Sequence, residues 1–230
     1  MSFRNCRILG LIPARGGSKG IPRKNLVELS RKPLISYTIQ AAKNSRYIDD
    51  VFVSTEDKEI ATLSRSFGVE IIDRPKTLAG DNIPSLRVIE HAIDYLAKKG
   101  FLYDVIVLLQ PTSPLRNSHH IDEALSLFFK SHFDSVVSVC QSHYLLWKRV
   151  DHRLLPVNHS VKKRVRRQDM PREFFENGAI YITTCKLILR DKKILGGRIG
   201  LYIMDKKCSV DIDDNFDLWL CEKIMADNKK

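Results

Sequence analysis

The sequence predicts one α/β domain whose mostly parallel sheet is covered by helices on both faces. Strand-like and helix-like apolar patterns alternate through the first two thirds of the 230 residues, as expected for parallel strands joined by right-handed helical crossovers. In the run DVIVLL over 104–109 every residue after Asp104 is apolar, which is typical of a strand buried on both faces. A chain of this length suits one domain with a sizeable core.

Apolar periodicity marks each element of the N-terminal half. An apolar run predicts a strand over 8–12, which Pro13 ends. Pro33 is a favoured first helical residue, and the apolar positions after it recur at helical spacing through 42. The other elements expected in this half are a strand over 51–54, a helix over 57–67, a strand over 69–72 and an amphipathic helix from 83 that ends at Gly100.

The C-terminal half continues this pattern and then interrupts it. The strand over 104–109 is followed by a helix over about 121–130 and a strand over 136–139. Regular patterns fail over 141–176, which is basic and contains Pro156 and Pro171. We interpret this stretch as an excursion inserted into a single domain spanning 1–230. Strands over 179–183 and 199–204 and a helix from about 216 complete the chain.

Charge and cysteine usage indicate the partners and the compartment. A net charge of +11 indicates an anionic partner. Five cysteines without CxxC spacing argue against a disulfide framework and a zinc site, and suit the cytoplasm. No apolar run approaches the roughly 18 residues of a membrane span, and we expect neither a membrane partner nor a secretory signal.

The run KKRVRR at 162–167 has three interpretations. It can be a solvated charge run, a nucleic-acid or nuclear-import patch, or a surface that faces a nucleotide or an acidic sugar. No aromatic residues interleave with it as a base-stacking platform requires. Nucleic acid is therefore the less favoured partner, and nuclear import stays open if the source is an animal.

The segment LIPARGGSKGIPRKN at 11–25 predicts an anion-binding loop. Four cations follow the first strand within ten residues, among three glycines and without an acidic residue; they are Arg15, Lys19, Arg23 and Lys24. Backbone N–H groups and basic side chains of such a loop suit a polyphosphate. The spacing matches neither the P-loop of NTPases nor the dinucleotide fingerprint. The alternative interpretation is an ordinary basic surface turn.

Two further segments carry polar groups suited to phosphate-transfer chemistry. In LLQPTSPLR at 108–116, Gln110 ends the buried strand, where an open sheet binds ligands; the alternative is a proline-rich turn with Asn117 or Ser118 as helix cap. In SVDIDD at 209–214, Asp211 and Asp213 project to one face and suit Mg²⁺. The alternative for that segment is an acidic cap of the last helix.

The segment RRQDMPREFFENGAIYI at 166–182 is the fourth candidate. Arg166, Arg167 and Gln168 suit a carboxylate, which guanidinium binds in bidentate fashion. Asn177-Gly178 before an alternating apolar stretch is otherwise a turn signal. The histidines lack metal-ligand spacing and the serines lack an activating pattern, so covalent catalysis is not indicated.

These four segments occur in the order and spacing of the N-acylneuraminate cytidylyltransferases, and the chain resembles that family from about residue 8 to 222. The relatives that activate legionaminic acid are similar too, and those acting on 3-deoxy-manno-octulosonate share the fold. The resemblance implies a Rossmann-like three-layer sandwich of the nucleotide-diphospho-sugar transferase type. It also implies Mg²⁺-dependent transfer of CMP from CTP to a nine-carbon 2-keto sugar acid, with release of pyrophosphate.

The resemblance implies roles for individual residues. The residues it assigns to CTP are Arg15, Lys19, Lys24, Asn25, Arg74 and Ser85. It places Gln110 against the acceptor sugar, and Lys148 and Arg167 near the carboxylate of that sugar or near the phosphates. Gln168 and Asn177 are the other residues expected to bind substrate. The resemblance makes Asp211 and Asp213 the metal ligands, and it gives catalytic roles to Lys24, Gln110, Arg167 and Asp211.

The resemblance also implies a homodimer in which the segment 141–176 reaches the partner's active site. One position departs from the bacterial pattern, since Phe175 stands where several bacterial members carry an arginine that contacts the sugar. The identity of the nonulosonic acid is therefore left open. The alternatives are a synthetase acting on 3-deoxy-manno-octulosonate and, from another class, a basic nucleic-acid-binding protein.

Overall fold

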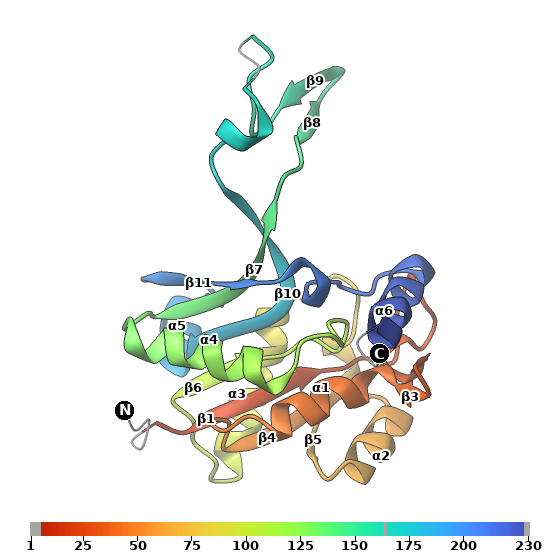
Figure 1. Cartoon of the computed structure of the whole chain (residues 1–230). Helices are drawn as coiled ribbons and strands as arrows, with labels where there is room; N and C mark the ends of the chain where they lie inside the picture. The colour runs from red at the N-terminus through yellow and green to blue at the C-terminus, as the bar shows by residue number, and fades with distance from the viewer. Residues whose placement is uncertain (1–5, 163–164, 228–230) are drawn as a thin grey trace.

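A seven-stranded sheet forms the centre of the computed structural model, which describes residues 6–162 and 165–227 (Figure 1). The strand order is β11-β7-β10-β6-β1-β4-β5, and β10 alone runs antiparallel to its neighbours in this sheet. The strands are β1 (Ile8–Pro13), β4 (Asp50–Thr55), β5 (Glu70–Asp73), β6 (Val105–Leu108), β7 (Ser135–Ser142), β10 (Glu173–Thr184) and β11 (Ile199–Met204). The predicted α/β class with a mostly parallel sheet is confirmed.

Helices cover both faces of this sheet. On one face lie α1 (Leu34–Lys43), α2 (Lys58–Ser66) and α4 (Ser118–Lys130), and on the other α3 (Ser85–Lys98) and α5 (Cys185–Asp191). Alternate residues of β1 serve the two layers, because Ile8 and Ile12 pack toward α1 and α4 while Leu9 and Leu11 pack toward α3. The last helix, α6 (Asn215–Asp227), lies beside a small hairpin formed by β2 (Glu28–Leu29) and β3 (Lys32–Pro33).

Local signals predicted several element ends correctly. Asn117 caps α4 in a capping box, accepting from the backbone N–H of His120 at 3.1 Å while the His120 ring accepts from the N–H of Asn117 at 3.2 Å. Asp214 accepts from the backbone N–H groups of Phe216 and Asp217 at the start of α6. Within the described residues there are also four short 3-10 helices; they are η1 (Lys24–Leu26), η2 (Lys76–Leu78), η3 (Arg167–Asp169) and η4 (Lys206–Cys208).

The turn expected at Asn177-Gly178 is wrong. Strand β10 continues through both residues, with a register irregularity against β7 between Glu176 and Tyr181. Gly178 has a φ of +71°, a backbone conformation that residues with a side chain rarely adopt. Glycine at this position therefore allows the strand to bulge without ending. The dipeptide signal is local, whereas pairing of both flanks of the bulge with β7 keeps the strand continuous.

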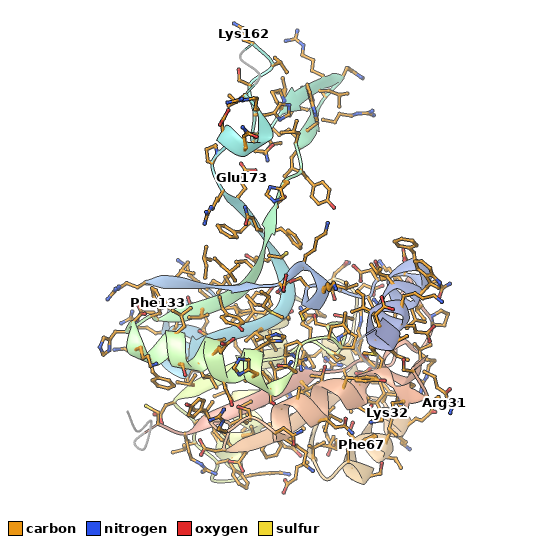
Figure 2. All side chains as sticks on the ribbon, in the orientation of Figure 1. Arg31, Lys32, Phe67, Phe133, Lys162 and Glu173 are labelled. Carbon is orange, nitrogen blue, oxygen red and sulfur yellow. The ribbon has the colours of Figure 1, made fainter. Side chains whose placement is uncertain are left out.

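The extended ends of β7 and β10 carry an arm that rises from the sheet (Figure 1). We call residues 143–172 the arm. It contains an antiparallel hairpin of β8 (Trp147–Val150) and β9 (Arg153–Pro156), so it is more regular than the sequence indicated. Its side chains stand clear of the helical layers (Figure 2). Many large apolar side chains of the arm are exposed; among them are Tyr144, Leu146, Trp147, Leu154 and Val157.

None of the described helices combines the length and the apolar character that crossing a membrane requires.

Candidate active site

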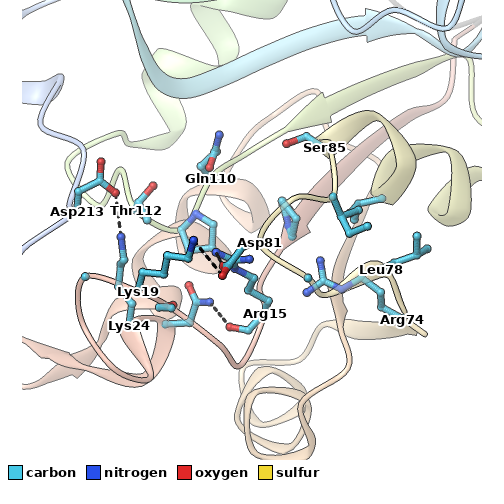
Figure 3. A pocket seen from close by; sticks show the side chains of 18 of the residues that line it. Arg15, Lys19, Lys24, Arg74, Leu78, Asp81, Ser85, Gln110, Thr112 and Asp213 are labelled. Atoms are coloured by element: carbon cyan, nitrogen blue, oxygen red, sulfur yellow. Dashed lines mark hydrogen bonds and ion pairs between the residues drawn. The ribbon is translucent and has the colours of Figure 1, made fainter. Parts of the chain in front are cut away.

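A cavity of about 540 Å³ lies at the carboxyl end of the parallel strands β1, β5 and β6 (Figure 3). This edge is where open α/β sheets bind ligands, because the loops that leave the strands converge there. The loop after β1 forms one wall, the segment 74–85 after β5 forms another, and the turn after β6 adds a third. Residues that precede α6 complete the lining, so segments from both ends of the chain meet in this cavity.

The loop after β1 is held by polar contacts from its neighbours. The N–H of Gly16 donates to Glu56 Oε1 at 2.8 Å, and Asn25 Nδ2 donates to the carbonyl of Arg15 at 2.9 Å. Arg23 adopts a left-handed backbone conformation with φ of 57° and pairs with Asp57 at 2.5 Å. These contacts fix the loop so that its remaining cations face the cavity.

Lys24 connects this loop to the carboxylate segment. Its Nζ donates to the carbonyl of Ile212 at 2.7 Å and to Asp213 Oδ1 at 3.0 Å. The two segments approach so closely that a Cβ built on Gly20 would lie 2.0 Å from the carbonyl oxygen of Asp213. Only glycine fits at position 20, and the contact fixes the carboxylate segment against the loop.

Asp211 is the more enclosed of the two carboxylates. Its Oδ1 is buried without a hydrogen-bond partner in the described structure. Burial, together with the neighbouring charge of Asp213, raises the pKa of Asp211, and a hydrogen bond from Thr112 opposes that rise. The N–H of Ile212 donates to the carbonyl of Thr112 at 2.8 Å, which joins the carboxylate segment to the turn after β6.

A second carboxylate, Asp81, stands across the cavity. Its Oδ1 lies 2.8 Å from Arg15 Nη2 and its Oδ2 lies 3.2 Å from Lys19 Nζ. The hydrogen bond from Lys19 and the charge of Arg15 hold the pKa of Asp81 below its usual range. Asp81 therefore stays ionised at neutral pH and links two walls of the cavity.

Arg74 is paired differently, inside the protein. Its Nη2 lies 2.8 Å from Glu56 Oε2, and only 4% of the Arg74 side chain and 12% of the Glu56 side chain are exposed. Because the other oxygen of Glu56 accepts from Gly16, one carboxylate connects the anion-binding loop to the arginine. Breaking such a buried pair is costly, so this contact is a fixed part of the site.

The turn after β6 rests on a buried arginine. Arg116 is 1% exposed, and its Nη2 donates to Thr38 Oγ1 at 2.7 Å and to the carbonyl of Gln110 at 3.3 Å. Burial lowers the pKa of Arg116. The guanidinium supports the backbone of Gln110, whose side chain lies at the cavity edge (Figure 3).

Nine of the predicted site residues line the cavity, and what each of them binds stays a prediction. They are Arg15, Lys19, Lys24, Asn25, Arg74, Ser85, Gln110, Asp211 and Asp213. In the described ranges, 6–162 and 165–227, no group of three His, Cys, Asp or Glu side chains forms a metal site. Asp211 and Asp213 are thus a pair of carboxylates without a third such ligand there.

Other predicted residues lie elsewhere. Lys148 is on β8 of the arm, and Gln168 lines a separate cavity of about 220 Å³ at the base of the arm. Arg166 pairs with Asp169 at 2.8 Å. Asn177 is 2% exposed, and its side chain bonds to Ser138 and Ser209. The side chain of Arg167 and residues 163–164 of KKRVRR lie outside the described residues.

Sequence reasoning missed three acidic residues that hold the site together and the buried position of a fourth residue, Arg116. Glu56 and Asp57 directly follow β4, and Asp81 lies in the segment after β5. Their places after parallel strands were a usable signal, since such ends share one edge of the sheet. The sequence indicated Arg116 as a polar contact of the turn after β6, but no local pattern indicates that its side chain is buried.

Comparison with known proteins identifies the family to which this chain is similar. A model of the family described as cytidylyltransferase matches residues 9–225. The chain is 36% identical over 218 residues to the N-acylneuraminate cytidylyltransferase of Escherichia coli O18:K1:H7 (strain RS218 / NMEC), covering 93% of the chain and 51% of that protein. It is 38% identical over 217 residues to N-acylneuraminate cytidylyltransferase B of Danio rerio, covering 93% of the chain and 50% of that protein. The chain spans about half the length of the curated relatives it matches.

Solved structures with low sequence identity share the fold. A CMP:2-keto-3-deoxy-manno-octonic acid synthetase complexed with CTP aligns with a TM-score of 0.72 at 15% identity, over 96% of this chain and 99% of the other. A 4-diphosphocytidyl-2C-methyl-D-erythritol synthase aligns with a TM-score of 0.68 at 13% identity, over 96% of this chain and 100% of the other. The predicted Rossmann-like sandwich is confirmed. On the match over residues 9–225, the chain belongs to the cytidylyltransferase family.

Proposed function

We propose that the protein transfers CMP from CTP to a nine-carbon 2-keto sugar acid of the sialic or legionaminic type and releases pyrophosphate. The observation that carries this proposal is the joint lining of one cavity by the cations Arg15, Lys19 and Lys24 and the carboxylates Asp211 and Asp213. The names of the relatives, N-acylneuraminate cytidylyltransferases at 36–38% identity, support the sugar class.

The reaction makes one bond and breaks one. The anomeric hydroxyl oxygen of the sugar attacks the α-phosphorus of CTP in line, the bond from that phosphorus to the bridging oxygen breaks, and pyrophosphate leaves. The hydroxyl proton passes to solvent. Catalysis of such a step consists mainly of alignment and charge neutralisation.

Each wall of the cavity has a task in this proposal. Arg15 and Lys19 bind the β- and γ-phosphates, while Asn25 keeps the loop in shape through the carbonyl of Arg15. Arg74 and Ser85, on the segment after β5, bind the nucleoside end. Gln110, at the end of β6, orients the acceptor sugar, because its amide both donates and accepts hydrogen bonds.

The residues also fit a magnesium ion. Asp211 Oδ1 is buried and has no partner in the described structure, which is unfavourable for a carboxylate unless a cation binds there. Two carboxylates and phosphate oxygens are the donors that Mg²⁺ prefers. Asp211 and Asp213 would hold the ion, which when bound would neutralise triphosphate charge.

A substitution with a matched control tests the metal assignment. Asp211→Asn should abolish Mg²⁺-dependent pyrophosphate release and leave the circular dichroism spectrum unchanged. Asp214→Asn is the control, because Asp214 caps α6 and asparagine is an equally good cap. Full activity of Asp211→Asn at ordinary Mg²⁺ concentrations would contradict the assignment.

The proposal includes a homodimer in which the arm of one subunit serves the site of the other. Lys148 and Gln168 lie on the arm and outside the cavity of their own subunit. Exposed apolar side chains such as Trp147 (51% exposed) and Leu155 (41% exposed) support burial of the arm against a second copy. A cytoplasmic location is also part of the proposal, since all five cysteines are free thiols.

A complementation experiment tests the shared site. Lys24→Met disables the cavity and Lys148→Met disables the arm, so each variant alone should be inactive. Co-refolding the two should restore activity, because mixed dimers combine an intact cavity with an intact arm. Activity that stays absent in mixtures of confirmed dimers would show that each subunit works alone.

A pyrophosphate-release panel tests the function as a whole. Purified protein, CTP and Mg²⁺ are combined with N-acetylneuraminic, legionaminic or 3-deoxy-manno-octulosonic acid. We expect release with a nine-carbon acid. Preference for the octulosonic acid would establish the alternative enzyme. Absence of release with every acid, together with salt-sensitive binding to nucleic acid, would favour the nucleic-acid-binding alternative.

A further inference from the structure

Asp81 occupies the position between two cations of the anion-binding loop. It lies in the segment between β5 and α3, and its two oxygens contact Arg15 and Lys19 at 2.8 Å and 3.2 Å (Figure 3). All three side chains are partly open to solvent; the exposed fractions are 33% for Arg15, 77% for Lys19 and 41% for Asp81. Two solvent-accessible ion pairs, Arg15–Asp81 and Lys19–Asp81, therefore lie along one side of the cavity.

The other two cations of the cavity are bound more firmly. Lys24, with 11% of its side chain exposed, bridges the carbonyl of Ile212 and Asp213. Arg74, with 4% exposed, is paired with the enclosed carboxylate of Glu56. Among the described lysines and arginines that line the cavity, Arg15 and Lys19 are thus the two whose partners an anion can replace at low cost.

Replacement depends on the charge of the incoming anion. Exposed ion pairs contribute little to stability, so their exchange is easy. A carboxylate carries one negative charge, whereas pyrophosphate or a triphosphate carries three to four and offers more acceptor oxygens. A multiply charged chain can engage both cations at once, and a ligand without phosphates at that position gains nothing from them.

We propose that Asp81 is a specificity-determining residue, a carboxylate that holds Arg15 and Lys19 in the free protein and is displaced only by polyphosphate ligands. This inference rests on the proposed function in so far as CTP is the natural polyphosphate. It predicts that the wild-type protein binds polyphosphates more weakly than a variant that keeps Arg15 and Lys19 but lacks the Asp81 carboxylate. Asp81 thereby restrains the affinity for CTP and for the product pyrophosphate alike.

The test compares three ligands on two variants by isothermal titration calorimetry. The ligands are CTP, inorganic pyrophosphate and CMP, and EDTA is present so that metal binding does not contribute. Asp81→Asn removes the competing charge and keeps the shape of the side chain. Asp94→Asn is the matched control, because Asp94 forms an exposed ion pair with Lys98 at 2.7 Å on α3 and does not line the cavity.

We expect Asp81→Asn to bind CTP and pyrophosphate about threefold or more tightly than wild type, as the loss of two exposed ion pairs allows. Binding of CMP should change less than about 1.5-fold on the same scale, and Asp94→Asn should match wild type with every ligand. A melting temperature close to that of wild type would show that the variant is folded.

Several results would overturn the proposal. Weaker or unchanged binding of pyrophosphate by Asp81→Asn would show that Asp81 does not compete for the cations. Equal tightening of CMP would show a general effect of charge. The pyrophosphate titration separates this proposal from the proposed function, because wild-type protein that binds pyrophosphate but not CTP contradicts the latter and still tests Asp81. Absence of binding by every ligand would contradict both.

Discussion

Lys24 and Asp213 are joined at 3.0 Å across the cavity, although 189 positions separate them in the chain. The same ammonium donates to the carbonyl of Ile212 at 2.7 Å, so it fixes both the side chain and the backbone of the carboxylate segment. Only 11% of the Lys24 side chain is exposed, whereas 81% of the Asp213 side chain is. Lys24 is the anchored partner, and Asp213 is the one free to accept a further ligand.

Lys24→Met should lower kcat/KM for pyrophosphate release by at least about 100-fold, the usual cost of losing one charge-stabilising donor in an active site. The protein should stay folded, with a loss of about 1.5–3 kcal/mol for the hydrogen bond from the charged ammonium to Ile212. Lys98→Met on α3 is the control, since its ion pair with Asp94 is exposed. Steady-state kinetics of both variants give the comparison, and a loss below about tenfold would be too small for the assigned role.

Glu56→Gln should destabilise the protein and weaken CTP binding together. Glutamine cannot neutralise Arg74, whose side chain is 4% exposed, and an unpaired buried charge costs about 3 kcal/mol or more. The anion-binding loop also loses the carboxylate that accepts from Gly16. Urea unfolding measures the first effect and titration with CTP the second.

The control for this change is Glu59→Gln, because Glu59 is 71% exposed and pairs with Arg23 at the surface. Its free energy of unfolding should stay within about 1 kcal/mol of wild type. If Glu56→Gln proved as stable as this control, the buried pair would not be the support that its geometry indicates.

Asp57→Asn should show that Asp57 stabilises the fold at neutral pH and not in acid. Burial alone would raise the pKa of Asp57, but the backbone N–H of Ile60 and the guanidinium of Arg23 lower it overall. Since the folded-state pKa lies below the unfolded value of about 4, the contribution is complete above that value and is lost as the pH falls through the folded pKa. Asp57 caps α2 by accepting from the backbone N–H groups of Glu59 and Ile60. Asparagine can cap the helix in the same way, so the variant isolates the charge.

Urea unfolding at several pH values measures this effect. The difference in free energy of unfolding between wild type and Asp57→Asn should be largest near neutral pH and shrink as the pH drops below about 4. Asp94→Asn should show a much smaller difference, because its ion pair with Lys98 is exposed on both sides. If the difference in free energy of unfolding between wild type and Asp57→Asn did not vary with pH, the effect of the substitution would come from packing and not from the charge.

Asn177→Ala should lower the free energy of unfolding by about 2–3 kcal/mol, because it leaves buried polar partners unpaired. Asn177 Oδ1 accepts from the hydroxyl of Ser138 at 2.6 Å, and its Nδ2 donates to Ser209 at 2.9 Å. Asn44→Ala, at the exposed end of α1, is the matched control. If Asn177→Ala unfolded like wild type and instead lost affinity for the sugar, the substrate role implied by the family resemblance would be favoured.

Local patterns predicted much of the fold because the elements are strongly periodic. The alternation of Leu9 and Leu11 with Ile8 and Ile12 supplies both layers from one strand, and the apolar residues 105–109 are all buried. Asn117 marks the start of α4 through a capping box, a signal confined to four residues. Such features depend on residues close together in the sequence, so they can be predicted from the sequence alone.

The parts that escaped prediction depend on distant partners. Asn177-Gly178 resembled a turn because the dipeptide favours one, yet pairing with β7 on both sides of the bulge keeps the strand continuous. Glu56 and Asp81 follow strands as ordinary acidic residues would, and only the tertiary structure brings them to Arg74, Arg15 and Lys19. The carboxylate pair was predicted, but its attachment to Lys24 was not.

The attachment of Ile212 to Lys24 sets an order of events during protein synthesis. The anion-binding loop leaves the ribosome before Ile212, which follows Lys24 by 188 positions. Closing so long a loop comes late in folding, after the local elements have formed. A nascent chain thus holds the cations of this loop long before its carboxylates, and it gains the whole cavity only when the segment leading into α6 docks.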